Sequence, residues 1–334
     1  MQTGVCALAL AFCGCGPQAA APDAGDAVIT LNYANFPPAS TFPCVQMERW
    51  KAEVEKRTGG RVKINTYPGG TLLGAKDIFD GVIAGTADIG NFAMSYQPGR
   101  FPVSEAMDLP HFFADAKTAS RLLADLIARF RPAEFDRVKV LTGFTCPPAV
   151  VMSSREIRTL ADLKNLPLRS SGTGAEVMRR LGASPVAMPQ SDVPDALQKG
   201  VVRGNVSSAE VLQDMHYAAY CPYVFKTDLC VISFAVVMNK AKYDALPEEV
   251  RQVLDGLYRE QAEWTGAYVD DHARKALDWS RERHQLKVNE PSAADRAVLR
   301  ATAQPLIDEY VARVTAKGID GKAVIAFIKE KLPR

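Results

Sequence analysis

The alternation of strand and helix patterns in the first half of the chain most constrains its fold. Residues 28–34 and 62–67 are typical of strands, and residues 41–58 between them are typical of a helix that ends at Gly59 and Gly60. The alternation continues, with helix patterns over 74–85 and 116–130 and strand patterns over 87–92 and 138–144. Strands separated by helices predict a largely parallel sheet with helices on both faces. The predicted class is therefore α/β.

The second half of the chain predicts a second lobe, because 334 residues exceed the usual size of one domain. Its elements are strands over 149–153, up to Arg169 and over 185–188, and helices from Ala175 and over 193–199. Residues 231–239 form an apolar strand pattern that is long enough to cross back to the first lobe. We expect the segments near 145–152 and 231–238 to form a two-stranded hinge.

A long helix is predicted after Pro247, which takes the favoured first-turn position. Residues 248–282 keep apolar side chains at helical spacing. A helix of about 35 residues is unusually long for a globular domain. The predicted lobes are residues 27–148 with about 236–262, and residues 149–235 with about 280–334.

Arg169 is the strongest candidate for ligand binding. It closes a short apolar run, 166–168, and Gly172, Gly174 and a helical pattern over 175–181 follow it. This order places a guanidinium at the carboxyl end of a strand, beside a helix N-terminus whose unpaired N–H groups attract anions. The guanidinium fork matches a carboxylate. The segment indicates an anion clamp rather than a reaction centre, although an arginine at a strand end more often forms a surface ion pair.

The stretch around Arg169 resembles the core of the solute receptors of tripartite ATP-independent periplasmic (TRAP) transporters. The likeness is carried by residues 162–169, 181–189 and 196–204, and further matches lie at 72–74, 85–90 and 238–247. It implies a two-lobed clamshell fold of the periplasmic-binding-protein type, with hinge strands and a long helix that spans both lobes. It also implies that Arg169 binds an organic acid, which the receptor delivers to membrane subunits of a transporter driven by an ion gradient.

The chain departs from many of these receptors at the other end of the expected ligand. Relatives that bind dicarboxylates or sugar acids carry a second arginine, and the corresponding position here is near Ala149. Ser207 stands where the family often has Asn, and Gln190 lies where Phe is common. A dicarboxylate would leave its second carboxylate unpaired. The sequence therefore favours a monocarboxylate, with a four-carbon dicarboxylate or a sugar acid as the alternative.

Aromatic residues in segments that are expected to face the ligand support the same choice. Phe36 follows the first strand, Asn91 and Phe92 end a later one, and Phe234 lies in the return strand. Each taken alone is more typical of the core than of a ligand contact, but together they favour a ligand with an apolar or aromatic body. Stacking on such rings is worth about 0.5–1.5 kcal/mol beyond area burial. The predicted ligand-binding residues are Arg169, Ser207, Phe36, Asn91, Phe92, Gln190 and Phe234.

The N-terminal segment is typical of an export signal. Residues 5–12 are an apolar run of signal-peptide length, far short of a membrane span. They lead to Cys15, which follows a small residue, and to a Pro/Ala/Asp-rich stretch. We expect residues 1–26 to be a signal peptide and lipoprotein tether, and the protein to be periplasmic and anchored through lipidated Cys15. Residues 1–4 lack Lys and Arg, so ordinary cleavage or another translation start is the alternative.

Little in the sequence favours an enzyme. The four histidines are scattered without metal-ligand spacing, and neither a G-x-S-x-G motif nor a Walker-type phosphate loop occurs. Gly172 and Gly174 resemble a dinucleotide loop, but Val177 replaces its third glycine. We expect no catalytic residue, metal or cofactor. An exported enzyme on a carboxylated substrate is the less favoured alternative.

The net charge bears on the possible partners, and the cysteine content bears on possible disulfides. A net charge of +2 gives no support to nucleic acid or an anionic membrane as a partner, and a monomer is expected. Processing at Cys15 would leave Cys44, Cys146, Cys221 and Cys230 in the folded part. Export permits disulfides, and Cys221 with Cys230 is the first pair to consider, but buried free thiols are the favoured interpretation.

Overall fold

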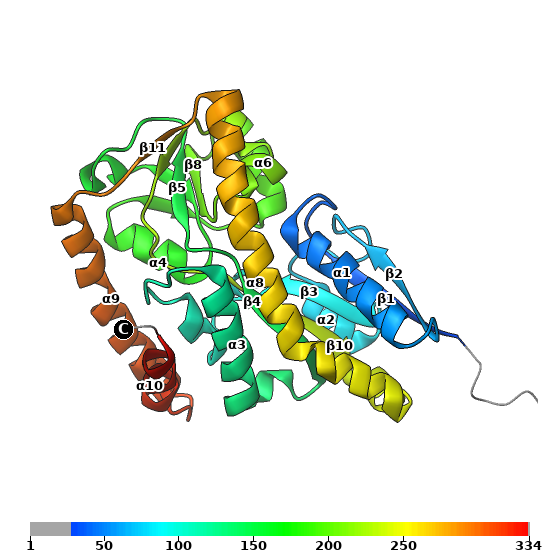
Figure 1. Ribbon diagram of the computed structural model, residues 1–334. Coiled ribbons are helices and arrows are strands. Elements are labelled where there is room, and N and C mark those ends of the chain that lie inside the picture. The colour runs from blue at the N-terminus through cyan, green and yellow to red at the C-terminus, as the bar shows by residue number, and fades with distance from the viewer. Residues whose placement is uncertain (1–27, 333–334) are drawn as a thin grey trace, which may run out of the picture.

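The computed structural model describes residues 28–332, which fold into two α/β lobes joined by a hinge (Figure 1). Each lobe is built on its own sheet, so the two-lobed α/β architecture predicted from the sequence is confirmed. The predicted signal peptide and lipidation site, residues 1–26 with Cys15, lie outside the described residues.

Lobe I contains a five-stranded sheet of order β2–β1–β3–β10–β4. Its helices begin as their sequences predict: Pro43 lies in the first turn of α1, and the Asp115 side chain accepts a hydrogen bond from the Thr118 N–H at the start of α3. The elements are β1 (Ile29–Asn35), α1 (Phe42–Arg57), β2 (Val62–Tyr67), α2 (Ile78–Ala84), β3 (Ile89–Ala93), α3 (Ala116–Phe130), β4 (Val138–Thr145), β10 (Ser233–Asn239) and α7 (Lys240–Asp244).

Lobe II contains a six-stranded sheet of order β11–β9–β5–β8–β6–β7. Its strands have only three or four residues each. The elements are β5 (Val150–Ser153), β6 (Pro167–Arg169), α4 (Gly172–Arg180), β7 (Ser184–Val186), α5 (Val193–Gln198), β8 (Gly204–Ser207), α6 (Val211–Asp214), β9 (Tyr223–Phe225) and β11 (Lys287–Asn289).

One strand in each sheet runs against the others. In lobe I, β10 is antiparallel to both β3 and β4, and in lobe II, β5 is antiparallel to both β8 and β9. The other strands that reach the space between the lobes end there, whereas β5 and β10 start at the hinge and run away from it. The prediction of a largely parallel sheet is therefore wrong for β5 and β10, the strands that follow the two hinge segments.

The hinge contains two hydrogen-bonded segments, in agreement with the predicted two-stranded crossing. One connects β4 to β5, and the other connects β9 to β10. The Cys146 N–H donates to the Ile232 carbonyl oxygen at 3.1 Å, and the Ala149 N–H donates to the Cys230 carbonyl oxygen at 2.8 Å. Because both segments are short and paired, a change in the angle between the lobes has few backbone positions at which to occur.

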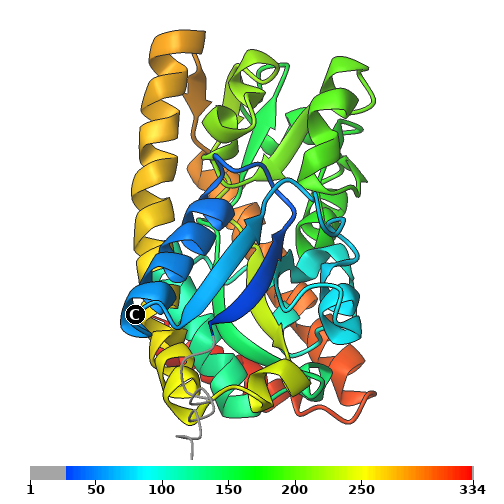
Figure 2. The same ribbon diagram turned by 90° about the vertical axis from the view of Figure 1, so that its right-hand side faces the viewer.

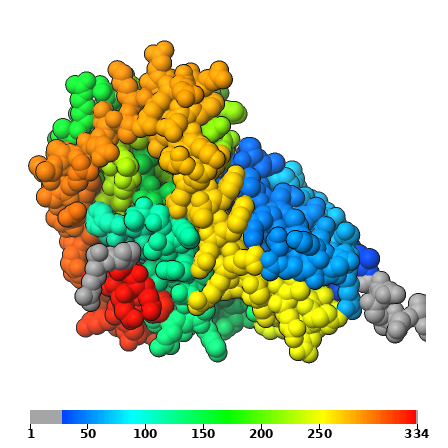
Figure 3. Space-filling model, viewed as in Figure 1, coloured from blue at the N-terminus to red at the C-terminus, as the bar shows by residue number. Residues whose placement is uncertain are grey.

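Helix α8 (Glu248–His284) is a third connection, and it runs along both lobes (Figures 1, 2 and 3). It contacts α1, α3 and β4 of lobe I and α6 of lobe II. It approaches α3 closely, since a Cβ on Gly266 would lie 2.6 Å from the Cα of Lys117. The Asp270 carboxylate accepts hydrogen bonds from the first N–H groups of α3 at 2.8 and 3.0 Å. The predicted lobe-spanning helix is confirmed.

The C-terminal helices are α9 (Ala293–Thr315) and α10 (Gly321–Lys331). Helix α9 reaches lobe II, where Glu309 pairs with Arg180 of α4. Helix α10 packs against α3 of lobe I, with Phe327 edge-to-face on Phe130 at 5.7 Å. The assignment of the whole of 280–334 to lobe II is therefore wrong, because the apolar face of α10 is buried against lobe I. Every helix within residues 28–332 is too short or too polar to cross a bilayer.

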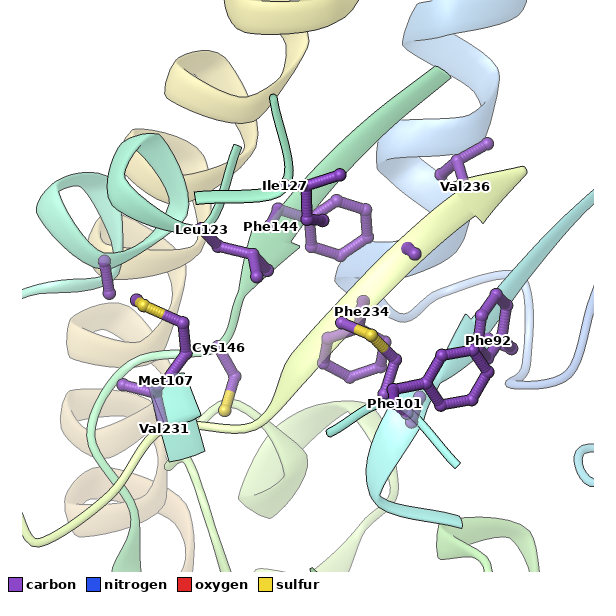
Figure 4. Packing of buried hydrophobic residues seen from close by; sticks show 14 of the residues in the cluster. Phe92, Phe101, Met107, Leu123, Ile127, Phe144, Cys146, Val231, Phe234 and Val236 are labelled. Carbon is purple, nitrogen blue, oxygen red and sulfur yellow. The ribbon is translucent and has the colours of Figure 1, made fainter. Parts of the chain in front are cut away.

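Aromatic rings fill the interior of lobe I and extend to the hinge (Figure 4). Phe92 of β3 lies beside Phe101, with 5.2 Å between ring centroids. Phe144 of β4 stacks on Phe234 of β10 at 5.3 Å. The second of these pairs lies at the end of the sheet that faces lobe II, which brings apolar surface to the space between the lobes.

Candidate ligand-binding cleft

A cavity lies between the two lobes at the hinge, with about 500 Å³ of space including its mouth. Lobe I lines it with residues that follow β1 and β3, and lobe II lines it with residues that end or follow β6, β7 and β8. Chain segments after the carboxyl ends of strands commonly form ligand sites in α/β proteins. The lining residues are Phe36, Pro37, Thr41, Phe42, Pro43, Tyr96, Cys146, Arg169, Gln190, Ser207, Ser208, Glu210, Val211, Asp214, Met215, Ile232 and Phe234.

Arg169 supplies the cationic group of this cavity. It is the last residue of β6 and is 0% exposed. Its Nε donates to the Met188 carbonyl oxygen at 2.8 Å, whereas its two terminal nitrogens reach only the Asn205 and Tyr96 oxygens, each at 3.5 Å. No carboxylate among the described residues pairs with it. A buried charge without a counter-ion is costly, so the terminal nitrogens are suited to receiving an anion.

Further polar groups surround Arg169. The Tyr96 hydroxyl, from lobe I, accepts a hydrogen bond from the Gln190 N–H of lobe II at 3.0 Å. The side-chain amide nitrogens of Gln190 and Asn205 are buried and have no partner among the described residues. Buried donors of this kind are rare in proteins unless a ligand or water satisfies them. Donors therefore cluster around the guanidinium, as an anion site requires.

The lobe I side of the cavity is aromatic. Phe36 stacks on Phe234 at 6.5 Å and meets Tyr96 edge-to-face at 5.4 Å, and Phe42 meets Phe234 edge-to-face at 5.7 Å. These rings hold one another in place, so they present a fixed apolar surface. Met215, Val211 and Ile232 add aliphatic surface from lobe II and the hinge.

Two carboxyl groups also line the cavity. Glu210 is 2% exposed and follows β8, and its Oε1 accepts a 2.6 Å hydrogen bond from the Ser208 hydroxyl. Asp214 lies one turn further, and its Oδ1 is 2.7 Å from Nε2 of His272 on α8. Burial raises the pKa of the Glu210 carboxyl to about 7. The hydrogen bond to Asp214 raises the pKa of His272.

The structure brings together five of the seven predicted ligand-binding residues. Arg169, Ser207, Gln190, Phe36 and Phe234 all line the cavity. Their contact with a ligand remains a prediction.

The other two predicted residues lie elsewhere. Asn91 is buried in β3, where its amide donates to the Asn35 side chain at 3.0 Å, and Phe92 packs against Phe79 and Phe101 in the core. Neither lines the cavity, because both belong to a strand that is buried on both faces and ends before the cleft.

The helix N-terminus beside Arg169 also differs from expectation. The first residues of α4 do not line this cavity, since Ser171 instead contacts Ser95 of lobe I, with 3.2 Å between their hydroxyl oxygens. Ala149, near which a second arginine was expected by resemblance, is buried in the hinge. Arg169 is thus the only Lys or Arg among the described residues that line the cavity.

Several lining residues were not predicted from the sequence, above all Tyr96, Glu210 and Asp214. Glu210 follows the carboxyl end of β8. Arg169 was selected as a charged residue at the carboxyl end of a strand, and the same criterion would have selected Glu210 if β8 had been recognised as a strand. Asp214 has no local signal, because its partner His272 is 58 residues away. Tyr96 lies in a short helical turn after β3, and this turn was not predicted.

Metal and redox chemistry find no support in this region. No group of three or more His, Cys, Asp or Glu side chains within residues 28–332 is placed to hold a metal ion. Cys44, Cys146, Cys221 and Cys230 are buried free thiols, so Cys221 and Cys230 do not pair. Burial raises the pKa of the Cys221 and Cys230 thiols to about 12, which keeps them protonated and unreactive.

Comparison with known proteins gives consistent matches. A sequence model of the family described as "Bacterial extracellular solute-binding protein, family 7" matches residues 33–313. A curated relative, the 2,3-diketo-L-gulonate-binding periplasmic protein YiaO of Escherichia coli, is 26% identical over 234 residues, which cover 69% of this chain and 71% of that protein.

Two solved structures cover nearly the whole chain. A TRAP periplasmic solute-binding protein from Desulfovibrio salexigens is 48% identical, with a TM-score of 0.82 over 91% of this chain and 96% of that one; it holds the C-terminus of a symmetry mate in its ligand-binding site. A marine metagenome TRAP solute-binding protein specific for aromatic acids, in complex with 3-hydroxybenzoate, is 26% identical, with a TM-score of 0.86 over 91% and 98%.

Proposed function

The chain belongs to family 7 of the bacterial extracellular solute-binding proteins, the family of the TRAP transporter receptors, and from this premise we propose that it binds a monocarboxylate with an apolar or aromatic body. Arg169 holds the carboxylate, and the aromatic side of the cleft packs against the remainder of the ligand. The two lobes close on the ligand, and the closed form docks on membrane subunits that carry the ligand across the membrane.

One observation carries the carboxylate assignment. The guanidinium of Arg169 is fully buried in the cleft, and its terminal nitrogens lack a carboxylate partner among the described residues. A planar carboxylate would give these donors a charge-assisted, two-pronged contact. The solved relative at 48% identity, which holds a polypeptide C-terminus in its ligand-binding site, is consistent with an affinity for carboxylates.

Two observations support a single carboxylate on an apolar body. Arg169 is the only cationic side chain among the described lining residues, so a second carboxylate would meet no counter-ion and would lie near Glu210 or Asp214. The rings of Phe36, Phe42 and Phe234 match an arene or another flat apolar group. The neighbour that binds 3-hydroxybenzoate has this kind of ligand.

A sugar acid is the second candidate. The polar side chains of Ser207, Ser208 and Glu210 in the lining offer hydrogen bonds to hydroxyl groups, and the Escherichia coli relative binds a sugar acid. A four-carbon dicarboxylate is less well matched for the reason of charge given above. An exported enzyme acting on a carboxylated substrate would have to convert its ligand, which can be tested directly.

The family places the protein in the periplasm, and lipid attachment at Cys15 is a further part of the proposal. Mass spectrometry of the mature N-terminus, extracted from membranes of the producing cell, tests it. A diacylated peptide that begins at Cys15 supports the anchor, and a soluble form cleaved at another residue refutes it.

The ligand class is tested by native purification followed by mass spectrometry of the released small molecules. Thermal-shift screening of organic acids accompanies it, since a ligand at 100 times its Kd stabilises the folded state by about 2.7 kcal/mol. We expect an aromatic or other apolar monocarboxylate, recovered unchanged after incubation with the protein. A sugar acid would select the second candidate, and conversion of the acid to a product would refute a receptor without enzymatic activity.

A further inference from the structure

Glu210 and Asp214 both line the cleft, and each has a carboxyl oxygen without a hydrogen-bond partner among the described residues. Glu210 is 2% exposed and the Asp214 side chain is 5% exposed, and both residues line the cavity. One oxygen of each carboxyl group is engaged, Glu210 Oε1 by Ser208 and Asp214 Oδ1 by His272. The second oxygens, Oε2 and Oδ2, are buried and have no hydrogen-bond partner among the described residues.

Both carboxyl groups are held in place by their neighbours. Ser208 lies two residues before Glu210, so the strand-to-helix turn that follows β8 fixes this contact. His272 belongs to α8 and stacks on Tyr268 of the same helix at 5.6 Å, so the longest helix of the fold fixes Asp214. A site whose groups are already oriented loses little entropy when a ligand binds.

The charges of the cavity indicate what these oxygens would accept. The Arg169 guanidinium is balanced by the carboxylate of the proposed ligand, and Oδ1 of Asp214 is engaged by Nε2 of His272 at 2.7 Å. Burial disfavours a negative charge on Glu210 by raising its pKa to about 7, and the ionised form of this carboxyl group can accept a hydrogen bond at Oε2. These groups require no second cation from the ligand, and a neutral hydrogen-bond donor satisfies the free oxygens of Glu210 and Asp214.

We infer that Glu210 and Asp214 form a second recognition point, which accepts a hydrogen bond from a hydroxyl group of the ligand. The preferred ligands are then hydroxy-substituted carboxylic acids rather than their unsubstituted or O-methylated counterparts. The inference rests on the proposed function, because Arg169 must hold the carboxylate for the hydroxyl group to reach this point.

The test compares matched acids by isothermal titration calorimetry on the unmodified protein. The probes are 2-, 3- and 4-hydroxybenzoate and 2- and 3-hydroxybutanoate, each measured against its methoxy and its unsubstituted counterpart. A hydrogen bond to a charged or partly charged acceptor is worth about 10- to 100-fold in affinity. We expect at least one hydroxy acid to exceed both of its counterparts by this factor.

The variant Glu210→Met, which keeps the length of the side chain but removes both oxygens, locates the effect. It should reduce the hydroxyl preference, measured as the ratio of the affinities for a hydroxy acid and its unsubstituted counterpart, to about threefold or less. Glu282→Met, on an exposed position of α8, is the matched control and should keep the full preference. The comparison of acids on the unmodified protein stands even if Glu210→Met does not fold.

The outcomes separate this inference from the proposed function. If none of the carboxylic acids binds, both are overturned. If acids bind through Arg169 but hydroxy acids are no tighter than methoxy acids, only the recognition point is overturned. The amino-substituted counterparts of the same acids are titrated in the same way. If they bind more tightly than all of the hydroxy acids, the assignment of a neutral donor is likewise overturned.

Discussion

Replacing Arg169 by alanine should abolish most of the affinity for the ligand without unfolding the protein. The guanidinium is fully buried at the end of β6, and only its Nε makes a short hydrogen bond, to the Met188 carbonyl oxygen. Alanine removes this bond and the packing of the side chain on Tyr96, whose ring centroid is 5.8 Å from the guanidinium carbon. It also removes a buried charge that no described carboxylate neutralises. The lost hydrogen bond and packing lower the stability of the folded state, whereas the loss of the buried charge raises it, so the two effects oppose each other.

The loss of affinity follows from the burial of the site. Removing one partner of a buried charge pair costs about 3–5 kcal/mol, because the remaining charge stays desolvated without compensation. Since each 1.4 kcal/mol changes Kd about tenfold, Arg169→Ala should weaken carboxylate binding by about 10²- to 10³-fold or more. Arg169→Lys should lose less, because it keeps the positive charge but not the two-pronged geometry.

Titration calorimetry with the acid recovered from the native protein measures this effect, and ligand-free thermal unfolding reports on folding. Arg283→Ala, on an exposed position near the end of α8, is the control and should bind as the unmodified protein does. Should Arg169→Ala fold normally and bind the acid within threefold of the unmodified protein, Arg169 would not be the carboxylate ligand. A large fall in the ligand-free unfolding temperature would instead assign the residue a structural role.

Two further predictions concern stability. Burial raises the pKa of Asp108 to about 8, well above its value near 4 in an unfolded chain, so the folded state holds an extra proton between these values and loses stability as pH rises through this window. Asp108→Asn keeps an oxygen for the Ser233 hydroxyl and should therefore be more stable than the unmodified protein at pH 8 but not at pH 4. Thermal unfolding of both proteins tests this, and a difference between their midpoints that is the same at pH 4 and pH 8 would contradict it. In α8, Gly266→Ala should destabilise the folded protein by about 1–3 kcal/mol, because the added Cβ would meet the backbone of Lys117 at 2.6 Å. Gly256→Ala, whose Cβ would have no atom within 4 Å, should stabilise it by about 0.5–1 kcal/mol. Urea unfolding of both variants measures these changes, and changes of the same sign would refute the packing argument.

The features that sequence patterns predicted are those with a strong local signal. Helix α3 was expected over 116–130 and occupies those residues, because its apolar positions repeat with the helical period and Asp115 caps it. The lobe-spanning helix has the same kind of signal over ten turns. Arg169 was selected because it ends a strand pattern shortly before a predicted helix, and because the resemblance to the TRAP receptors implies a carboxylate-binding arginine at this position.

What the sequence did not predict depends on contacts between distant residues. Strands β8, β9 and β11 of lobe II were not predicted, unlike β5, β6 and β7; they have three or four residues, too few for a period of two to be recognised. Phe92 and Asn91 lie in a strand that is buried on both faces, so alternation could not tell which side chains reach the cleft. The direction of β10 was equally hidden, since a strand that returns from another lobe can enter a sheet in either sense.

Arg169 and Glu210, the two polar groups of the proposed recognition site, are kept apart by their own partners. Arg169 and Glu210 line one cavity, and a direct ion pair between them would occupy the groups that a ligand needs. Arg169 is instead held by the Met188 carbonyl oxygen, and Glu210 by Ser208. Each of these partners belongs to lobe II, so both groups are oriented by that lobe alone. Tyr96 of lobe I contacts Gln190 and Arg169 across the cleft, and in the proposed function such contacts accompany closure of the lobes on the ligand.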